Sequence, residues 1–460
     1  MIGLPPFLSF SENERILQLK TLMIILRTVK NISSLNIAAS VLLFLAAILA
    51  AVVANSSLSP VYQDFLLQEL HLRIGNFNLF SHGGHPLKMI EFINDCLMTV
   101  FFLAVGLEIK RELLVGELSS VRKAALPFIA ACGGMVVPVV IYALSVASGT
   151  PETRGMAIPM ATDIAFSLGV LSLLGKRVPL SLKIFLTAFA VVDDIGGILV
   201  IALFYSADVA YGYLIAAAVL YVFLYYMGKF GVTQKIFFLF FGVIIWYLFL
   251  QSGIHSTISG VKLAFVIPAR PRLDAGKYIE RIRDIIGEFP VSKSDNIVLT
   301  NAQIATLKQV ERASDYVISP LQSLEDNLHG AVSFVILPLF AFANAGVVFS
   351  GSGSIVGDVS IAVAAGLLLG KFLGIYLFTW LAVKSGVALM PAGMNWKNIA
   401  GVSLLGGIGF TVSLFIANLS FADEYPELLN QAKFGVLVGT VLAGVLGYVV
   451  LNWVLPKREK

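Results

Sequence analysis

Charged side chains are scarce in this sequence: Asp, Glu, Lys and Arg make up 13% of the residues, against about 25% in a typical soluble domain. This scarcity excludes a large solvated surface, and a net charge of +4 is too small to indicate nucleic-acid binding. Apolar residues take up 58% of the chain, and apolar runs of about 18 or more residues recur along it. The sequence therefore predicts a polytopic, all-α membrane protein.

Cysteine and histidine are also rare. The two cysteines, Cys96 and Cys132, lie in or beside apolar segments, so they predict small buried side chains rather than a disulfide framework. No Cys/His cluster suits a soft metal, and we expect no cofactor. The apolar run around Met23–Leu26 is short and interrupted by Arg27, so it does not predict a cleaved signal peptide.

Twelve apolar stretches are candidate transmembrane helices, with edges uncertain by several residues: 38–55, 91–108, 124–148, 155–174, 180–206, 209–227, 235–250, 254–268, 328–349, 359–383, 396–421 and 432–455. Lys and Arg concentrate in alternate loops, as after the second stretch, whereas the loop at 420–430 is acidic. Because cytoplasmic loops carry the excess of Lys and Arg, both termini are predicted to be cytoplasmic.

Residues 38–455 are predicted to form the transmembrane domain, between a cytoplasmic N-terminal extension at 1–37 and a cytoplasmic tail at 456–460. Within this domain, residues 60–90 form an external segment, where alternation around Gly75 and Asn76 predicts a weak β-hairpin that a second copy could extend. A long cytoplasmic loop at 269–327 contains "KYIERIRDIIGEF", whose isoleucine spacing predicts surface helices.

Four ionisable residues lie deep in apolar stretches: Asp163, Asp193, Asp194 and Lys371. A charge at the bilayer centre costs about 3 kcal/mol even on the mildest scale, so such residues are usually functional. Adjacent residues of a helix point about 100° apart, so Asp193 and Asp194 cannot face one site equally. One could bind an ion while the other pairs with Lys371, and a purely structural salt bridge remains an alternative for Asp193 and Lys371.

Two of the stretches contain helix-breaking residues. Pro159 precedes Asp163 by four residues, and "LLGGIGFTVSLF" (404–415) has three clustered glycines. Interrupted helices in comparable halves of a chain indicate a transporter's substrate site, although glycines also permit close helix packing. Asp163 could offset the positive N-terminal ends of the half-helices, and Lys371 the negative C-terminal ends.

Carboxylates and the Thr162 hydroxyl are ligands that suit a hard cation such as Na⁺. A partly desolvated carboxylate can also hold a proton at physiological pH. Because a proton and a cation compete for the same carboxylate, Asp163 and Asp194 together predict an ion exchanger.

The motifs that carry these residues resemble those of the NhaA-type sodium/proton antiporters, from "FINDCLMTVFFLAVGLEIKREL" through "AIPMATDIAFSLGVLSLLGKRVP", "LKIFLTAFAVVDDIGGILVIALFY", "SGIHSTISGV" and "LPLFAFANAG" to "GGIGFTVSLFIA". The resemblance implies an inverted-repeat fold of twelve helices, with two discontinuous helices crossing at the midplane of the bacterial inner membrane. It also implies pH-regulated, electrogenic exchange of Na⁺ or Li⁺ for protons, and a homodimer through the external hairpin.

Residue by residue, the resemblance implies that Asp163 and Asp194 bind Na⁺ or Li⁺, that Asp193 pairs with Lys371, and that Thr162 lies at a helix break. Whether Lys371 carries a proton or only compensates charge stays open. The resemblance also implies a weaker set for pH response and the ion path: Glu108, Glu112, His255, Glu325 and Asp95. An ordinary charged helix end for the first two and a helix cap for Asp95 are the alternatives.

Three departures from the family leave the pH profile open, though not the exchange chemistry: the long N-terminal extension, the long loop at 269–327, and Gln322 where the family has a basic residue. An intramembrane aspartyl protease is disfavoured because "VVDDIGG" places both acids on one helix without a Gly-x-Gly-Asp motif. The protein is therefore predicted not to be an enzyme. A sodium-coupled symporter for an organic solute competes with the exchanger as an interpretation, and a channel is a third.

Overall fold

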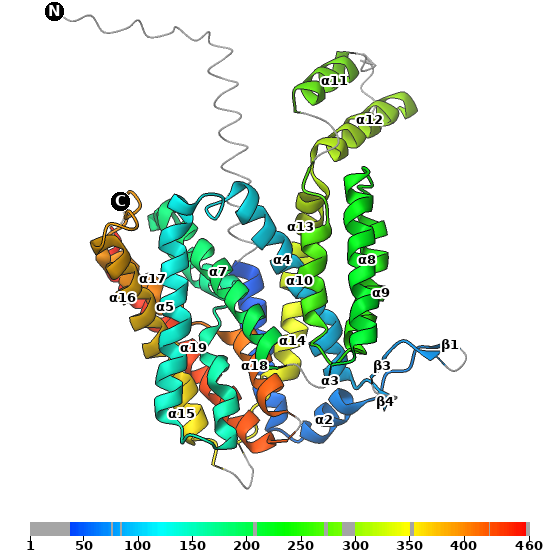
Figure 1. The fold of residues 1–460 in the computed structure, drawn as a ribbon. Coiled ribbons are helices and arrows are strands. Elements are labelled where there is room, and N and C mark those ends of the chain that lie inside the picture. The colour runs from blue at the N-terminus through cyan, green and yellow to red at the C-terminus, as the bar shows by residue number, and fades with distance from the viewer. Residues whose placement is uncertain are drawn as a thin grey trace, which may run out of the picture.

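Helices make up most of the structure, a computed structural model that describes residues 37–74, 77–82, 85–205, 209–270, 275–287, 300–349, 354–422 and 424–456. Most of them run roughly along one axis and form a single bundle (Figure 1). The expected N-terminal extension, up to residue 36, and the tail after residue 456 lie outside the described residues.

Within the described residues, eight helices are long and apolar enough to cross a membrane. They are Ile37–Ala54, Met89–Val115 (α3, a π-helical turn and α4), Val121–Ser145 (α5), Leu180–Phe204 (α7), Tyr211–Lys229 (α8), Pro320–Asn344 (α13, a π-helical turn and α14), Asp358–Lys384 (α15, a π-helical turn and α16) and Pro426–Val454 (α19). The chain is therefore an all-α, multi-pass membrane protein.

Two further helix pairs qualify only when joined across a bend. A 3₁₀ helix, η2 (Pro151–Met160), meets α6 (Ile164–Leu173) at 45°, and α17 (Trp396–Leu405) meets α18 (Phe410–Phe421) at 43°. Counting each pair as one span gives up to ten.

The remaining two predicted spans correspond to short apolar helices. They are α9 (Lys235–Leu250) and α10 (Thr257–Val266), which pack against each other. At about 1.5 Å per residue, α9 is about 24 Å long, less than the roughly 30 Å hydrocarbon core of a bilayer. The number of twelve spans therefore stays a prediction.

The long loop is shorter than its predicted bounds of 269–327, because the next membrane helix begins at Pro320 rather than near residue 328. The Ser319 side chain accepts a hydrogen bond from the Gln322 N–H (3.2 Å), and proline suits the first turn of a helix. The loop contains α11 (Ala275–Gly287) and α12 (Asn301–Val317). These two helices lie beyond one end of the bundle, at the top of Figure 1.

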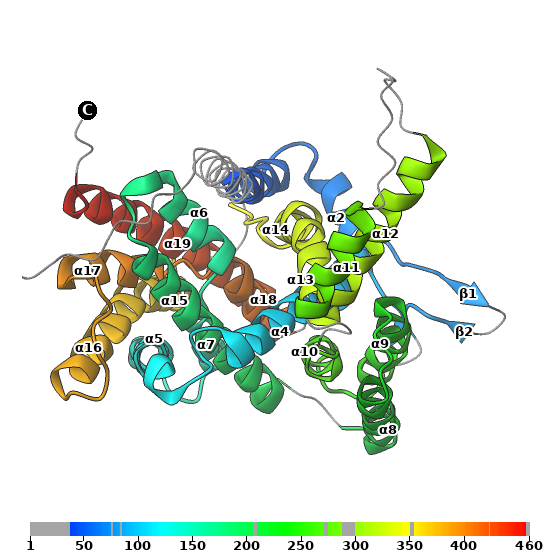
Figure 2. The same ribbon diagram turned by 90° about the horizontal axis from the view of Figure 1, so that it is seen from above.

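The segment predicted as external lies at the opposite end of the bundle (Figure 1). It begins with a helix that the alternation did not predict, α2 (Ser59–Leu67), and continues as two small antiparallel pairs. In these pairs β1 (Arg73–Ile74) joins β2 (Phe77–Asn78), and β3 (Ser81–His82) joins β4 (His85–Pro86). Viewed from above, β1 and β2 project away from the helices (Figure 2).

The helices α5 and α16 cross closely. Gly133 and Gly374 face each other there, and a Cβ on either residue would collide with the backbone oxygen of the other. The absence of side chains at these two positions lets the backbones approach closely. As a result, Lys371 at the start of α16 lies beside Gly134 of α5.

Candidate ion-binding site

The first helix break is formed by three extended residues, Ala161 to Asp163, between η2 and α6. Pro159 cannot donate a backbone hydrogen bond, which favours an interruption here. Asp163 then serves as the N-cap of α6, because its Oδ1 accepts a hydrogen bond from the Phe166 N–H (3.0 Å).

The second break lies between Leu405 and Phe410, in the glycine cluster. A Cβ on Gly409 would lie 2.8 Å from the Ala161 carbonyl oxygen. The two breaks are therefore in contact, and this glycine allows the contact because it has no side chain.

Hydrogen bonds connect the two breaks crosswise. The Asp163 N–H donates to the Ile408 carbonyl (2.6 Å), and the Thr162 hydroxyl donates to the Gly406 carbonyl (2.8 Å). In the other direction, the Ser413 hydroxyl donates to the Ile158 carbonyl (2.7 Å). Backbone groups that an interrupted helix leaves unpaired are costly inside a bilayer, so these bonds stabilise the crossing.

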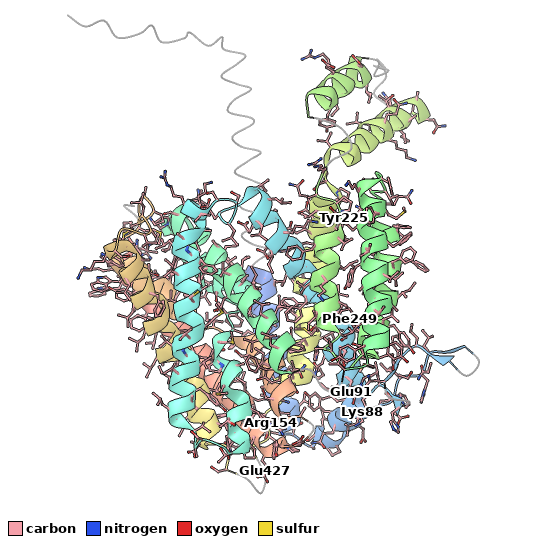
Figure 3. The ribbon with its side chains drawn as sticks, in the orientation of Figure 1. Lys88, Glu91, Arg154, Tyr225, Phe249 and Glu427 are labelled. Carbon is pink, nitrogen blue, oxygen red and sulfur yellow. The ribbon has the colours of Figure 1, made fainter. Side chains whose placement is uncertain are left out.

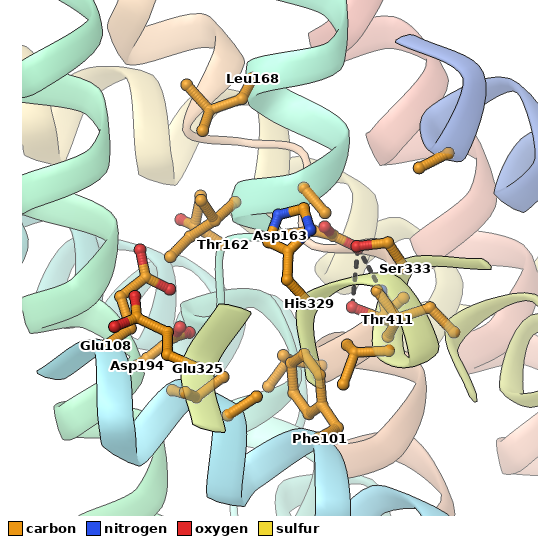
Figure 4. Close-up of a pocket in the computed structure, with 18 of the residues that line it drawn as sticks. Phe101, Glu108, Thr162, Asp163, Leu168, Asp194, Glu325, His329, Ser333 and Thr411 are labelled. Carbon is orange, nitrogen blue, oxygen red and sulfur yellow. Dashed lines mark hydrogen bonds between the residues drawn. The ribbon is translucent and has the colours of Figure 1, made fainter. Parts of the chain in front are cut away.

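Asp163 also contacts α18, through a residue that sequence reasoning did not single out. The Asp163 Oδ2 accepts hydrogen bonds from both the hydroxyl (2.7 Å) and the backbone N–H (3.2 Å) of Thr411 (Figure 4). One carboxylate therefore caps two half-helices, α6 and α18. The sequence feature that could have identified Thr411 is its position, since it carries a hydroxyl in the first helical turn after the glycine cluster.

The adjacent acids of α7 have different surroundings. The Asp193 Oδ2 lies 2.5 Å from the Lys371 Nζ, and both side chains are fully buried. Asp194 lines a cavity instead and is 8% exposed. No donor in the described part of the chain is hydrogen-bonded to its carboxylate. Because adjacent residues of a helix point about 100° apart, Asp193 faces Lys371 whereas Asp194 faces the cavity.

The cavity has a volume of about 290 Å³ and lies against both breaks. Asp194, Asp163, Thr162 and Thr411 all line it, and Glu108 and Glu325 lie near Asp194 (Figure 4). A water molecule occupies about 30 Å³ in the liquid, so the cavity has room for a small cation with part of its hydration shell. Its carboxylate and hydroxyl oxygens are the ligands that hard cations prefer.

Three acids of the predicted pH-response set are grouped around one arginine. Arg111 lies 2.9 Å from a carboxylate oxygen of Glu112 and 2.9 Å from one of Glu325, and Glu108 lines the cavity with Arg111. Lys110 is not part of this group. Its Nζ donates to the carbonyls of Ala264 (3.3 Å), Phe265 (2.8 Å) and Ile267 at the C-terminal end of α10.

The other two residues of that set lie elsewhere. Asp95 precedes Glu108 by 13 residues of one helix, about 20 Å along its axis. His255 lies beside Asp95, and its Nε2 is 3.7 Å from the Asp95 Oδ1. The helix-cap alternative for Asp95 is wrong, because α3 begins at Met89 and the Lys88 N–H donates to the Glu91 carboxylate there (2.9 Å; Figure 3).

A buried amide network was not predicted. The Asn344 side chain, which is fully buried, donates to the Asn94 Oδ1 (2.8 Å) and accepts from the Asn418 Nδ2 (2.9 Å). The network of these three asparagines connects α14 and α18 to the π-helical turn Ile93–Leu97, which precedes α4. Single asparagines inside apolar stretches are the signal that could have identified them, since buried amides require partners.

Comparison with known proteins identifies the family of this chain. The family model described as Na+/H+ antiporter 1 matches residues 30–451. The chain is 75% identical over 437 residues to the Na(+)/H(+) antiporter NhaA of Bacteroides fragilis, covering 95% of this chain and 100% of that protein. The antiporter of the same name from Bacteroides thetaiotaomicron is 74% identical over 438 residues (95% and 100%), and that from Parabacteroides distasonis is 50% identical over 448 residues (96% and 99%). The chain therefore belongs to the Na+/H+ antiporter 1 family.

Proposed function

We propose that this protein exports Na⁺ or Li⁺ in exchange for protons across the bacterial inner membrane. The single observation that carries the proposal is the Asp194 carboxylate, which has no hydrogen-bond partner among the described residues and lines a cavity beside two helix breaks. The names of the relatives, which are those of antiporters, support the same reaction.

In the proposed cycle, a proton and a cation bind Asp194 in turn. The carboxylate cannot bind both at once, so arrival of one favours release of the other. Asp163 contributes a second negative charge, and the Thr162 hydroxyl oxygen contributes a neutral ligand. Electrogenic exchange, with more protons entering than cations leaving, requires a second proton-carrying group. Asp163 and the Asp193–Lys371 pair are the candidates for it.

We further propose that the two bent helix pairs are discontinuous helices crossing at the midplane of an inverted repeat. Their similar bends of 45° and 43° support this arrangement, as do the reciprocal hydrogen bonds between the breaks. Small movements at such a crossing would expose the cavity alternately to the two sides of the membrane.

The pH dependence is proposed to arise where Arg111 groups Glu108, Glu112 and Glu325. Of this group, Glu108, Arg111 and Glu325 line the same cavity as Asp194, and Glu112 is joined to them through Arg111. Asp95 and His255 form a separate pair at the π-helical turn before α4, so any contribution they make to pH response arises at a different place from the Arg111 group.

For topology, we propose that both termini and the loop containing α11 and α12 are cytoplasmic. The segment 60–90 would then be external, and its small strand pairs would form the contact of a homodimer by pairing with a second copy.

The test is proton movement in everted membrane vesicles on addition of NaCl or LiCl, from pH 6.5 to 8.5, with Asp194→Asn as the control. We expect either salt to dissipate an imposed pH gradient in the wild type only, with a rate that depends on pH. If neither salt acts at any pH, exchange is excluded, and solute-dependent Na⁺ uptake would then indicate a symporter.

A further inference from the structure

We propose that Thr411 is a positioning residue for cation binding. It holds the Asp163 carboxylate on the first turn of α18, so that cation affinity in the cavity depends on a side chain of the second broken helix. This inference rests on the proposed function, because it assigns a role within the same cavity.

The contact is buried and directed. Thr411 is 1% exposed and Asp163 is 3% exposed. The Thr411 hydroxyl and backbone N–H both donate to Oδ2, while the Phe166 N–H donates to Oδ1. With donors from α18 on one oxygen and from α6 on the other, the plane of the carboxylate is defined by both helices.

Thr411 differs from the other hydroxyl groups at the crossing. Thr162, Ser167 and Ser413 donate to backbone carbonyls, at 2.8, 3.0 and 2.7 Å. Those bonds connect a side chain of one broken helix to the backbone of the other. Thr411 instead donates to a carboxylate oxygen of Asp163, one of the two acids that line the cavity.

The consequence is a division of labour between the two cavity acids. An ionised carboxylate has about four acceptor sites, and three donors already contact Asp163. Asp163 therefore contributes mainly a charge in a set position, whereas Asp194 is free to exchange its ligand. A displacement of α18 relative to α6 has to break the bonds on one of the two oxygens of Asp163, which links the cavity to the movement of the broken helices.

The experiment compares Thr411→Val, which removes the hydroxyl at nearly constant shape, with Thr411→Ser, which retains it. Full-length protein in proteoliposomes provides the apparent KM for Na⁺ and the maximal rate, and calorimetry on the purified protein provides the Kd for Na⁺. We expect Thr411→Val to raise KM and Kd about tenfold, a loss of about 1.4 kcal/mol of binding free energy, since a carboxylate that is not held must be ordered by the ion. The maximal rate should change less than threefold, and Thr411→Ser should restore both constants.

Ser413→Ala is the matched control, because it removes a buried hydroxyl slightly further along α18 that bonds the crossing without touching an acid. We expect its KM and Kd to stay within threefold of wild type. Should Thr411→Val not yield folded protein, Thr411→Ala removes the same hydroxyl without apolar bulk and carries the same expected increase.

The inference is overturned if the folded variant without the Thr411 hydroxyl has the wild-type KM and Kd for Na⁺. It is also overturned if Ser413→Ala raises KM and Kd as much as Thr411→Val does. The calorimetric readout separates this result from the proposed function. A wild-type protein that binds Na⁺ without moving protons would exclude exchange, yet the Thr411 variants would still decide the inference. A wild-type protein that binds no Na⁺ would overturn both.

Discussion

The two sides of α7 differ in how they accommodate a buried acid. On one side, Asp193 is paired with Lys371, and neither side chain is exposed. On the other side, Asp194 lines a cavity and has no hydrogen-bond partner among the described residues. One turn of one helix thus contains an acid that is paired with a lysine of another helix and an acid that faces a cavity.

The difference teaches that burial alone does not identify an ion-binding residue. A buried ion pair satisfies its own electrostatics, although desolvation can offset much of the gain, whereas removal of one partner is costly. A buried carboxylate that has no partner among the described residues lacks such internal compensation, and in the proposed cycle a proton or a cation supplies it. Variants that alter one side of α7 at a time can separate the two roles.

The largest effect is expected for Asp194→Asn. An amide can neither take up a proton nor balance the charge of a cation, so Na⁺-dependent proton movement should fall to the background rate. Because the Asp194 carboxylate has no hydrogen-bond partner among the described residues, thermal unfolding in detergent should change little. Residual exchange above about one-tenth of the wild-type rate would contradict the assignment of Asp194.

On the paired side, Lys371→Ala should destabilise the protein by about 3–5 kcal/mol, because it leaves Asp193 buried without a partner. A fall in the thermal unfolding temperature measures this effect. The double variant with Asp193→Asn should recover much of the stability, since it removes the uncompensated charge.

The same double variant sharpens the comparison through transport. Electrogenic exchange that persists in it would assign the pair a structural role. Electroneutral exchange would assign the second proton to the Asp193–Lys371 pair. If Lys371→Ala alone changed neither the unfolding temperature nor transport, that result would contradict the pairing of Asp193 with Lys371.

A smaller effect is expected for Asn344→Leu, which leaves the amides of Asn94 and Asn418 without their buried partner. An unsatisfied buried polar group costs about 1–3 kcal/mol. We expect a lower unfolding temperature in the same detergent assay, with KM for Na⁺ unchanged, because this network does not line the cavity. The triple replacement of all three asparagines by leucine should be less destabilising than the sum of the single changes.

The smallest effect is expected for Arg177→Ala, remote from both sides of α7. Arg177 donates to the Asn452 side chain and to carbonyls at the C-terminal end of α19, including that of Leu455 (2.9 Å). These bonds are largely solvent-exposed, so their loss should cost no more than about 1 kcal/mol. Exchange rates should match wild type, and a large change in them would show that this helix end takes part in transport.

Much of this architecture was predictable because its signals are local. Long apolar runs identify membrane helices, since a bilayer requires about 20 apolar residues in succession. The helix breaks follow from Pro159 and the glycine cluster, whose effects act within one turn. The start of a helix at Pro320 was missed because its first turns are polar, although the cap at Ser319 marks it.

The sequence by itself determined that this chain is a membrane protein with acids at membrane depth, because hydropathy and charge are properties of contiguous residues. Only the tertiary structure decided that Asp194 rather than Asp193 lines the cavity, that Thr411 holds Asp163, and that Arg111 groups distant glutamates. Each of these relations joins segments far apart along the chain. The packing of whole helices decides them, and local sequence patterns do not report it.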